Sequence, residues 1–262
     1  MQGWRRTFRH YVVAGCAALI AMSTFLGGAA LTAEPGDLSD DGQTPGQVSQ
    51  TSEKKKRSLS KDPPGMKRLV PDADLWIDPK HNRVVVDGTV VLREGFLEMF
   101  ACPIGTKEHE SIVAVDAKAY AVHAGLLAAG AKSGAPAEFE PEYKPASGTE
   151  IEIDVVWRDA DGNDQRARAQ DWVRDIESGK SMQYPWVFAG SGFWTDEASG
   201  IKYYMAEQGD FICVSNFPSA MLDLPVPSSQ DNQHLAYEAF TERIPPLGTR
   251  VRLVLTPKLD KK

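Results

Sequence analysis

Cysteine is scarce in this sequence: the chain has three, and only Cys102 and Cys213 lie beyond residue 33. An iron–sulfur cluster normally takes about four cysteine ligands, so this cofactor is disfavoured and no other cofactor is predicted. The chain also lacks a glycine-rich phosphate loop, and the run from Gly190 to Gly192 lacks the leading glycine of a nucleophile elbow. The sequence therefore offers none of the usual signs of nucleotide binding or serine hydrolase chemistry.

Basic residues are also few in the globular part of the chain, compared with acidic residues. From Met66 onward the chain has 21 Lys plus Arg against 30 Asp plus Glu, a net charge of −9. Proteins that bind nucleic acids need clustered positive charge, because they displace counterions from the phosphates. Nucleic acid is excluded as a partner on this ground.

Charge is missing altogether from one stretch near the N-terminus. Three basic residues, Arg5, Arg6 and Arg9, precede an uncharged run of 23 residues from Tyr11 to Ala33. A basic start followed by an apolar run is read by export machinery, and about 20 apolar residues can span a bilayer. Residues 1–33 are therefore predicted to be a signal peptide or an N-terminal membrane anchor, with membrane attachment through residues 11–33.

Both interpretations place the rest of the chain outside the cytoplasm, in the periplasm or at the cell surface, free or anchored to the inner membrane. Arg5-Arg6-Thr7-Phe8 matches the core of a twin-arginine signal, and general export is the alternative. Small residues at Gly28-Ala29-Ala30 and at Leu31-Thr32-Ala33 offer two cleavage sites. The route and the cleavage stay open.

Two further segments follow the leader. Residues 34–65 contain only three large apolar residues, so they cannot bury enough surface to offset the entropy of ordering. We expect a disordered linker there and one globular domain over residues 66–262.

The pattern of the globular part is mostly that of strands. Strands are predicted at Leu75–Ile77, 96–101, Ser111–Val115, Ile151–Trp157, 165–172, 186–189, 201–206, 211–215 and 250–256. An Asp87-Gly88 pair between two β-branched runs indicates a hairpin turn, and one helix is expected from Asp116 to about Ala129. The predicted fold class is α+β, a mainly antiparallel sheet with one principal helix, in a single domain after the export segment.

The densest polar stretch is the loop from Cys102 to Ser111. It offers a thiol, an ammonium, two carboxylates, an imidazole and a hydroxyl within ten residues. Functional groups often lie on loops between strands, so this loop is the candidate binding site. Its candidate residues are Cys102, Lys107, Glu108, His109, Glu110 and Ser111. A solvated loop with ordinary ion pairs is the alternative interpretation.

Two pairings of these residues can be weighed from the sequence. His109 and His123 are not expected to share a metal, because a strand and a partly returning helix separate them, and His123 fits a helix–sheet interface better. No metal site is predicted. Cys102 and Cys213 can form a disulfide outside the cytoplasm, or each can pack as a free thiol in an apolar strand.

Aromatic residues concentrate between Tyr184 and Phe217. Exported proteins use aromatic platforms to stack on sugars. However, Trp186, Phe188 and Tyr203 lie at strand spacing, and burial in the core explains them equally well.

Three blocks of residues carry a resemblance to a known family. The blocks from Cys102 to Ser111, from Trp186 to Ser191, and from Asn216 to Pro225 resemble the YdjY-domain family of exported bacterial proteins. The resemblance covers roughly residues 74–258. The family has no settled activity to transfer, and the ferredoxin-like label sometimes attached to it requires cysteines that this chain lacks.

Taken together, the sequence favours an exported cell-envelope protein whose domain binds a ligand or partner. The partner is an unknown small ligand, a peptide or an envelope polysaccharide, and an anionic group is expected to meet Lys107. The alternative is a hydrolase-type enzyme, with or without a metal, built on the Cys102–Ser111 loop around His109.

Overall fold

The computed structural model describes residues 59–228 and 235–259, which belong to one compact unit, Lys55–Lys262. The predicted leader and residues 34–58 of the predicted linker lie outside the described residues. Within the described part, no helix is both long and apolar enough to cross a membrane. The barrel strands and the described core all belong to this unit, so residues 55–262 contain every contact of the described fold.

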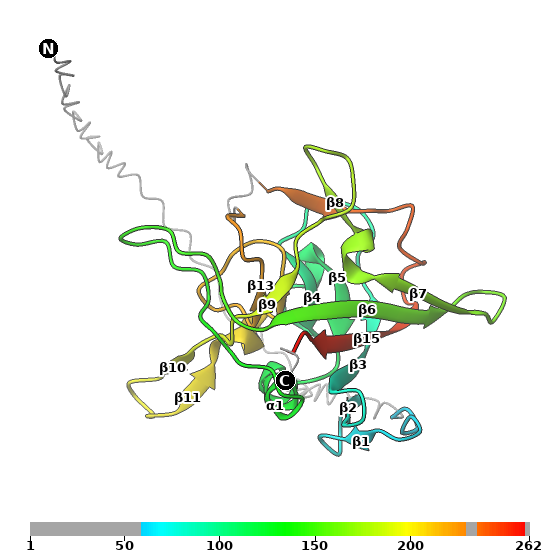
Figure 1. Ribbon diagram of the computed structural model, residues 1–262, viewed down its shortest axis with the longest axis horizontal. Helices are drawn as coiled ribbons and strands as arrows, with labels where there is room; N and C mark the ends of the chain where they lie inside the picture. The colour runs from blue at the N-terminus through cyan, green and yellow to red at the C-terminus, as the bar shows by residue number, and fades with distance from the viewer. Residues whose placement is uncertain (1–58, 229–234, 260–262) are drawn as a thin grey trace, which may run out of the picture. The chain divides into compact units, whose positions relative to one another are not determined.

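A closed barrel forms the centre of the described domain (Figure 1). Eight strands follow one another around it: β3 (Arg83–Val90), β15 (Arg250–Pro257), β6 (Glu150–Arg158), β9 (Trp186–Phe188), β13 (Leu222–Asp223), β12 (Ile212–Cys213), β4 (Met99–Pro103) and β5 (Ser111–Val115). The pairing of β5 with β3 closes the ring. Only β12–β13 and β4–β5 are parallel among these pairings, so the expectation of a mainly antiparallel sheet is confirmed.

Shorter elements extend or cover the barrel. They are β1 (Lys67–Arg68) and β2 (Leu75–Asp78) beside β3, β7 (Asp164–Arg168) beside β6, the pair β8 (Val173–Asp175) and β14 (Tyr237–Ala239), the pair β10 (Phe193–Thr195) and β11 (Lys202–Tyr204), the 3₁₀ turns η1 (Glu108–Glu110), η2 (Ala169–Trp172) and η3 (Met205–Gln208), and α1 (Ala119–Ala128). The helix α1 is the single α-helix of the described residues, as predicted.

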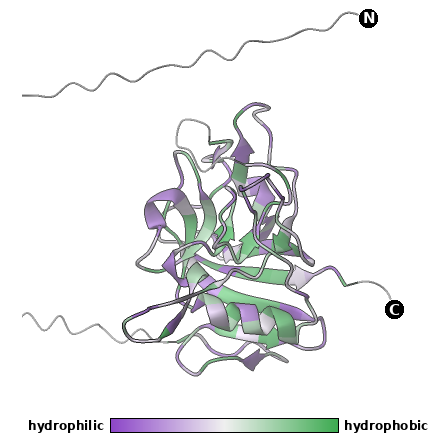
Figure 2. Ribbon diagram, turned by 90° about the vertical axis from the view of Figure 1, so that its left-hand side faces the viewer, coloured by the Kyte–Doolittle hydropathy of each residue, from purple (hydrophilic) through white to green (hydrophobic). Residues whose placement is uncertain are grey.

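Alternation along β6 shows how the sequence closes the core. Ile151, Ile153 and Val155 are buried, whereas the acidic residues between them are partly or fully exposed. A strand places successive side chains on opposite faces, so one face of β6 enters the barrel and the other meets water. Apolar residues accordingly line the inner strands and polar residues the loops (Figure 2).

Large aromatic side chains fill the middle of the core. The ring of Phe100 lies 5.6 Å from that of Trp186 and 6.4 Å from that of Trp172, and all three are fully buried. The indole nitrogen of Trp186 donates to the Cys213 carbonyl at 2.7 Å, which satisfies its one polar group. Such rings each bury roughly 150–250 Å² and dominate the packing energy.

The predicted hairpin turn at Asp87-Gly88 is wrong, because β3 runs straight through both residues. The Asp87 carboxylate pairs with the Arg252 guanidinium on β15 at 2.6 Å. Gly88 is needed for a close approach, since a Cβ there would lie 2.7 Å from Val113 Cγ1 and 2.8 Å from the Ala114 carbonyl oxygen of β5. Asp87 therefore contacts β15 and Gly88 allows β5 to approach closely. These are tertiary contacts, and the local turn pattern of the sequence does not reveal them.

The N-cap of the helix lies two residues later than Asp116, the predicted cap. Lys118 occupies the N-cap without a side-chain cap bond, so Asp116 does not cap it. Val122 and Leu126 are buried, and a Cβ at Gly125 would meet Leu69 and Val84. The apolar face of α1 thus packs beside β2 and β3, which places His123 at the edge of the barrel.

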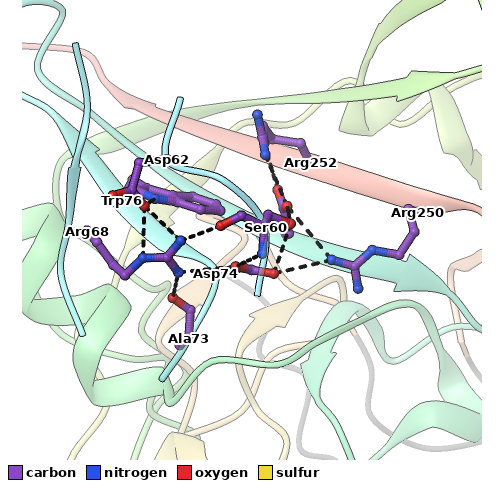
Figure 3. Close-up of polar contacts among 9 residues, drawn as sticks. Ser60, Asp62, Arg68, Ala73, Asp74, Trp76, Arg250 and Arg252 are labelled. Carbon is purple, nitrogen blue, oxygen red and sulfur yellow. Dashed lines mark hydrogen bonds and ion pairs between the residues drawn. The ribbon is translucent and has the colours of Figure 1, made fainter. Parts of the chain in front are cut away.

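A short strap, residues 59–66, lies on the wall formed by β2, β3 and β15 (Figure 3). Ser60 donates from its backbone nitrogen to Asp74 Oδ1 at 2.8 Å and from its hydroxyl to Asp74 Oδ2 at 3.0 Å. Asp62 accepts hydrogen bonds from Trp76 Nε1 at 2.8 Å and from Arg68 Nε at 2.9 Å. Ser60 and Asp62, which the sequence assigns to the linker, are therefore part of the described fold.

Candidate binding surface

The loop from Cys102 to Ser111 connects β4 to β5 through η1. Since β4 and β5 are parallel, the chain must return along the barrel to start β5. This short return turns Lys107 toward the end of β12 and leaves η1 near the surface.

Lys107 is the centre of an ion cluster that the sequence does not reveal. Its ammonium nitrogen lies 3.0 Å from Asp210 Oδ1, 3.5 Å from Glu98 Oε2 and 3.5 Å from Glu110 Oε1. It also lies 4.4 Å from the centroid of the Phe217 ring. We call Glu98, Lys107, Glu110 and Asp210 the Lys107 cluster.

The backbone is shaped to fit the lysine stem. Gly209 has φ +132°, and a Cβ there would lie 2.5 Å from Lys107 Cγ. Glycine is therefore required for its backbone conformation and for the space above the stem. Ser219 donates a short hydrogen bond to Asp210 and helps to hold that carboxylate.

Electrostatics in the cluster follow from this crowding. Burial lowers the pKa of Lys107, but the carboxylates of Asp210, Glu110 and Glu98 outweigh it, so the pKa lies above its usual value. Burial and the Glu110 carboxylate raise the pKa of Glu98. The lysine stays charged and is surrounded by an excess of negative charge. An anionic ligand gains little there, which removes the geometric support for the predicted anion contact.

The other predicted loop residues do not converge on one point. Glu108 Oε1 accepts a hydrogen bond from the Gly105 backbone nitrogen at 2.7 Å. The His109 side chain is 77% exposed, and its Nε2 lies 3.8 Å from Glu110 Oε2. Ser111 donates to the Lys107 carbonyl at 2.7 Å. This arrangement brings no nucleophile within reach of the imidazole.

Both cysteines are buried free thiols. Burial raises the pKa of Cys102 and of Cys213 above the ordinary value, which lowers thiolate reactivity. In the β4–β12 register Cys213 lies opposite Met99, three strand positions from Cys102, or about 10 Å along the strand. A disulfide usually needs Cα atoms closer than about 7 Å, so the geometry gives no support to this bond.

A second polar layer lies next to the cluster. Asp223 is fully buried, and its carboxylate accepts from Asn216 Nδ2 at 2.9 Å and from the Leu224 nitrogen at 2.7 Å. Tyr143 donates to Asn216 Oδ1 at 3.0 Å. Burial raises the pKa of Asp223 to about 7. Burial outweighs the hydrogen bonds that favour the carboxylate, so Asp223 is protonated in mild acid and loses its proton near neutral pH.

The three sequence blocks that resemble a known family meet in this region. Lys107 belongs to the first block, Asn216 and Asp223 to the third, and Ser191 of the second donates to the Ser219 carbonyl at 2.6 Å. Glu98 and Asp210 were missed as site residues by sequence reasoning, because acidic residues far apart in the chain carry no local sign of their meeting. Among the described residues, no group of three or more His, Cys, Asp or Glu side chains is arranged to hold a metal.

His123 lies where the helix expectation places it, against the barrel. Tyr204 donates to the Gly190 carbonyl at 3.0 Å, and His123 Nδ1 lies 2.8 Å from the same hydroxyl oxygen. This bond joins the imidazole to the Tyr204 hydroxyl at the edge of the barrel. Burial lowers the pKa of His123 despite its hydrogen bond to Gly190, so the ring is neutral and structural.

The aromatic residues divide into two sets. Trp186, Phe188 and Phe211 are buried in the core, as expected, but Tyr203 is 44% exposed and the core interpretation is wrong for it. It belongs to the aromatic hairpin, residues 193–204, formed by β10 and β11. This hairpin is a separate two-stranded sheet away from the barrel wall (Figure 1).

The aromatic hairpin exposes four large apolar side chains: Phe193 at 68%, Trp194 at 51%, Ile201 at 52% and Tyr203 at 44%. Trp194 and Tyr203 are directly opposite in the register, and their rings stack at 5.6 Å with an interplanar angle of 29°. A contiguous exposed apolar patch commonly marks an interaction site. It is the most distinct exposed aromatic patch among the described residues.

The described residues form a mainly antiparallel β-barrel domain with one helix, the Lys107 cluster at one end and an exposed aromatic hairpin. Compared with known protein families, residues 75–256 match the YdjY domain. The chain therefore belongs to the YdjY-domain family, whose function is unassigned. No curated protein and no solved structure shows significant similarity to it.

Proposed function

We propose that this chain is an exported cell-envelope protein whose YdjY domain binds a ligand or partner without transforming it. The exposed stacked pair Trp194–Tyr203 on the aromatic hairpin is the observation that carries the proposal. Leaving two large rings in water costs free energy, at roughly 25 cal/mol per Å² of apolar surface. A partner that covers these rings recovers that cost.

The proposed surface differs from the loop that the sequence favours. Lys107 is already paired with three carboxylates, and the His109 imidazole lies in solvent beside one carboxylate. Such a loop stabilises its own end of the barrel more readily than it grips a ligand. The hairpin has no comparable internal use for Trp194 and Tyr203.

Co-sedimentation of residues 55–262 with bacterial envelope fragments tests the binding surface. We expect the fraction in the pellet to fall at least threefold when Trp194→Ala and Tyr203→Ala are combined. Tyr184→Ala is the matched control, because Tyr184 is a similarly exposed aromatic residue outside the hairpin. Loss of binding in His109→Ala, with the hairpin variant unaffected, would return the site to the Cys102–Ser111 loop.

The proposed location rests on the basic start and the uncharged run from Tyr11 to Ala33. A reporter enzyme that is active only outside the cytoplasm, fused after Lys262, should be active with the full chain. It should be inactive when two charges interrupt the run, as in Ala18→Asp with Ala21→Asp. Equal reporter activity in both fusions would refute export by this segment.

A further inference from the structure

The two faces of the aromatic hairpin are chemically different. Directly opposite residues of an antiparallel pair project to the same side. Phe193 and Tyr204 form one such pair, and Tyr204 is buried where it contacts His123. The neighbouring pair, Trp194 and Tyr203, therefore projects to the other side, away from the barrel.

Among the paired residues of this outer face, only Asp196 carries a charge. Asp196 and Ile201 pair next along the hairpin by a backbone bond of 2.9 Å, and alternation places them on the face of Trp194 and Tyr203. The Asp196 carboxylate accepts from the backbone nitrogens of Ala198 and Ser199 at 2.8 and 3.0 Å. Those bonds lower the pKa of Asp196 and tie it to its own turn. The ligand of this face needs no charge.

The size of the face argues against a protein partner. With roughly 200 Å² for each large side chain, the exposed fractions of Trp194, Ile201 and Tyr203 amount to about 300 Å². A stable protein interface needs about 800 Å² from each partner. The surface suits a slim ligand that covers two or three side chains.

We propose that the Trp194–Tyr203 face binds an uncharged polysaccharide by stacking on its pyranose rings. A pyranose offers one face of C–H bonds to an aromatic ring and keeps its hydroxyls at the rim, where the indole N–H and the Tyr203 hydroxyl can meet them. The inference rests on the proposed function and names the chemical class of its ligand. The domain binds the polysaccharide without catalysis, so no bond of the sugar is broken.

Isothermal titration of residues 55–262 with chitohexaose, cellohexaose and maltohexaose tests the ligand class. We expect at least one of these neutral hexasaccharides to bind with a millimolar or tighter Kd. Trp194→Ala and Tyr203→Ala should each weaken it at least tenfold. Tyr184→Ala is the control, and circular dichroism of each variant should be unchanged because the altered side chains are exposed.

The possible failures are distinguishable. If none of the three sugars binds, while envelope co-sedimentation still depends on Trp194, the sugar proposal is overturned and the binding function stands. If sedimentation of the chain on its own shows a dimer that Trp194→Ala abolishes, a second copy is the occupant and the sugar proposal is again overturned. If neither sugar nor envelope binding depends on the hairpin, both proposals fall.

Discussion

Asp223 is a buried acid whose proton links folding to pH. In the folded domain burial raises its pKa to about 7, whereas the ordinary value is 3.8. Between these values the folded state binds the proton that the unfolded chain has released. The free energy of unfolding therefore falls as the pH rises from about 4 to about 7, by at most about 1.4 kcal/mol per pH unit from this group.

Replacing Asp223→Asn should remove this pH dependence. The amide oxygen can still accept from Asn216 and Leu224, so we expect the variant to match the wild type near pH 4. Near pH 8 it should be more stable, by about 1–3 kcal/mol. Urea unfolding at several pH values measures the difference. Asp72→Asn at an exposed position is the control, and a variant with an unchanged pH profile would refute the assignment.

Lys107 offers a second prediction at the same scale. Lys107→Met leaves Glu98, Glu110 and Asp210 close together without their cation. Removing one partner of a buried ion pair costs about 3–5 kcal/mol; Lys107 is partly exposed, so we expect about 2 kcal/mol at pH 7. The deficit should shrink on acidification, because Glu98, whose pKa is raised, takes up a proton. The exposed Lys180→Met should change stability by less than about 0.5 kcal/mol, and an equal loss there would contradict the prediction.

At the scale of elements, the strap gives a boundary that can be tested by truncation. A chain that begins at Leu59 keeps the hydrogen bonds of Ser60 to Asp74 and of Asp62 to Trp76. A chain that begins at Met66 loses them and removes partners from the buried carboxylates of Asp74 and Asp87. We expect the shorter chain to be less stable by about 2–4 kcal/mol, because partners of buried groups are expensive to lose.

Thermal and urea unfolding of the two truncated chains measure that difference, and Ser60→Ala in the longer one should lose part of it. Equal stability of both chains would show that the strap contributes nothing. The family match begins only at residue 75, so the strap itself precedes the matched region.

Sequence patterns predicted elements well where local periodicity and burial agree. The alternation of Ile151, Ile153 and Val155 gave β6, and β2, β5 and β15 lie at their predicted positions. Local sequence patterns gave wrong predictions where tertiary contacts determine the structure of a segment. Asp87-Gly88 has the composition of a turn, but Asp87 pairs with Arg252 of β15 and Gly88 allows the close approach of β5. Strand spacing could not reveal that Tyr203 is exposed and Tyr204 buried, because the inner side of a hairpin is set by what lies beneath it.

At the scale of the whole molecule, closure of the barrel depends on pairings that no local pattern contains. The two-residue strands β12 and β13 are too short to show periodicity, yet they connect β9 to β4. The Lys107 cluster has the same origin. Lys107 and Glu110 were predicted as site residues, but the pairing of β4 with β5 brings Glu98 to them and the pairing of β12 with β4 brings Asp210.

Gly88 tests the closure directly. Gly88→Ala would press a methyl group onto Val113 and Ala114 and push β3 away from β5. We expect a loss of about 2–3 kcal/mol, in the range of overpacked cores, and faster hydrogen exchange of the β5 amides. Gly162→Ala is the comparison: its φ of +85° is strained but its Cβ meets open space, so about 1 kcal/mol is expected. A harmless Gly88→Ala would mean that the ring does not close there.

The two sequestered thiols place a condition on the order of events during biogenesis. A chain that reaches an oxidising compartment before folding presents Cys102 and Cys213 to oxidants, and a bond formed then would link β4 and β12 at positions about 10 Å apart in the native register. A chain cross-linked in this way cannot adopt the native pairing of β4 with β12, so the barrel cannot close. Translocation of an already folded domain avoids this cross-link, and the pair Arg5-Arg6 is a feature of the signals that direct folded cargo.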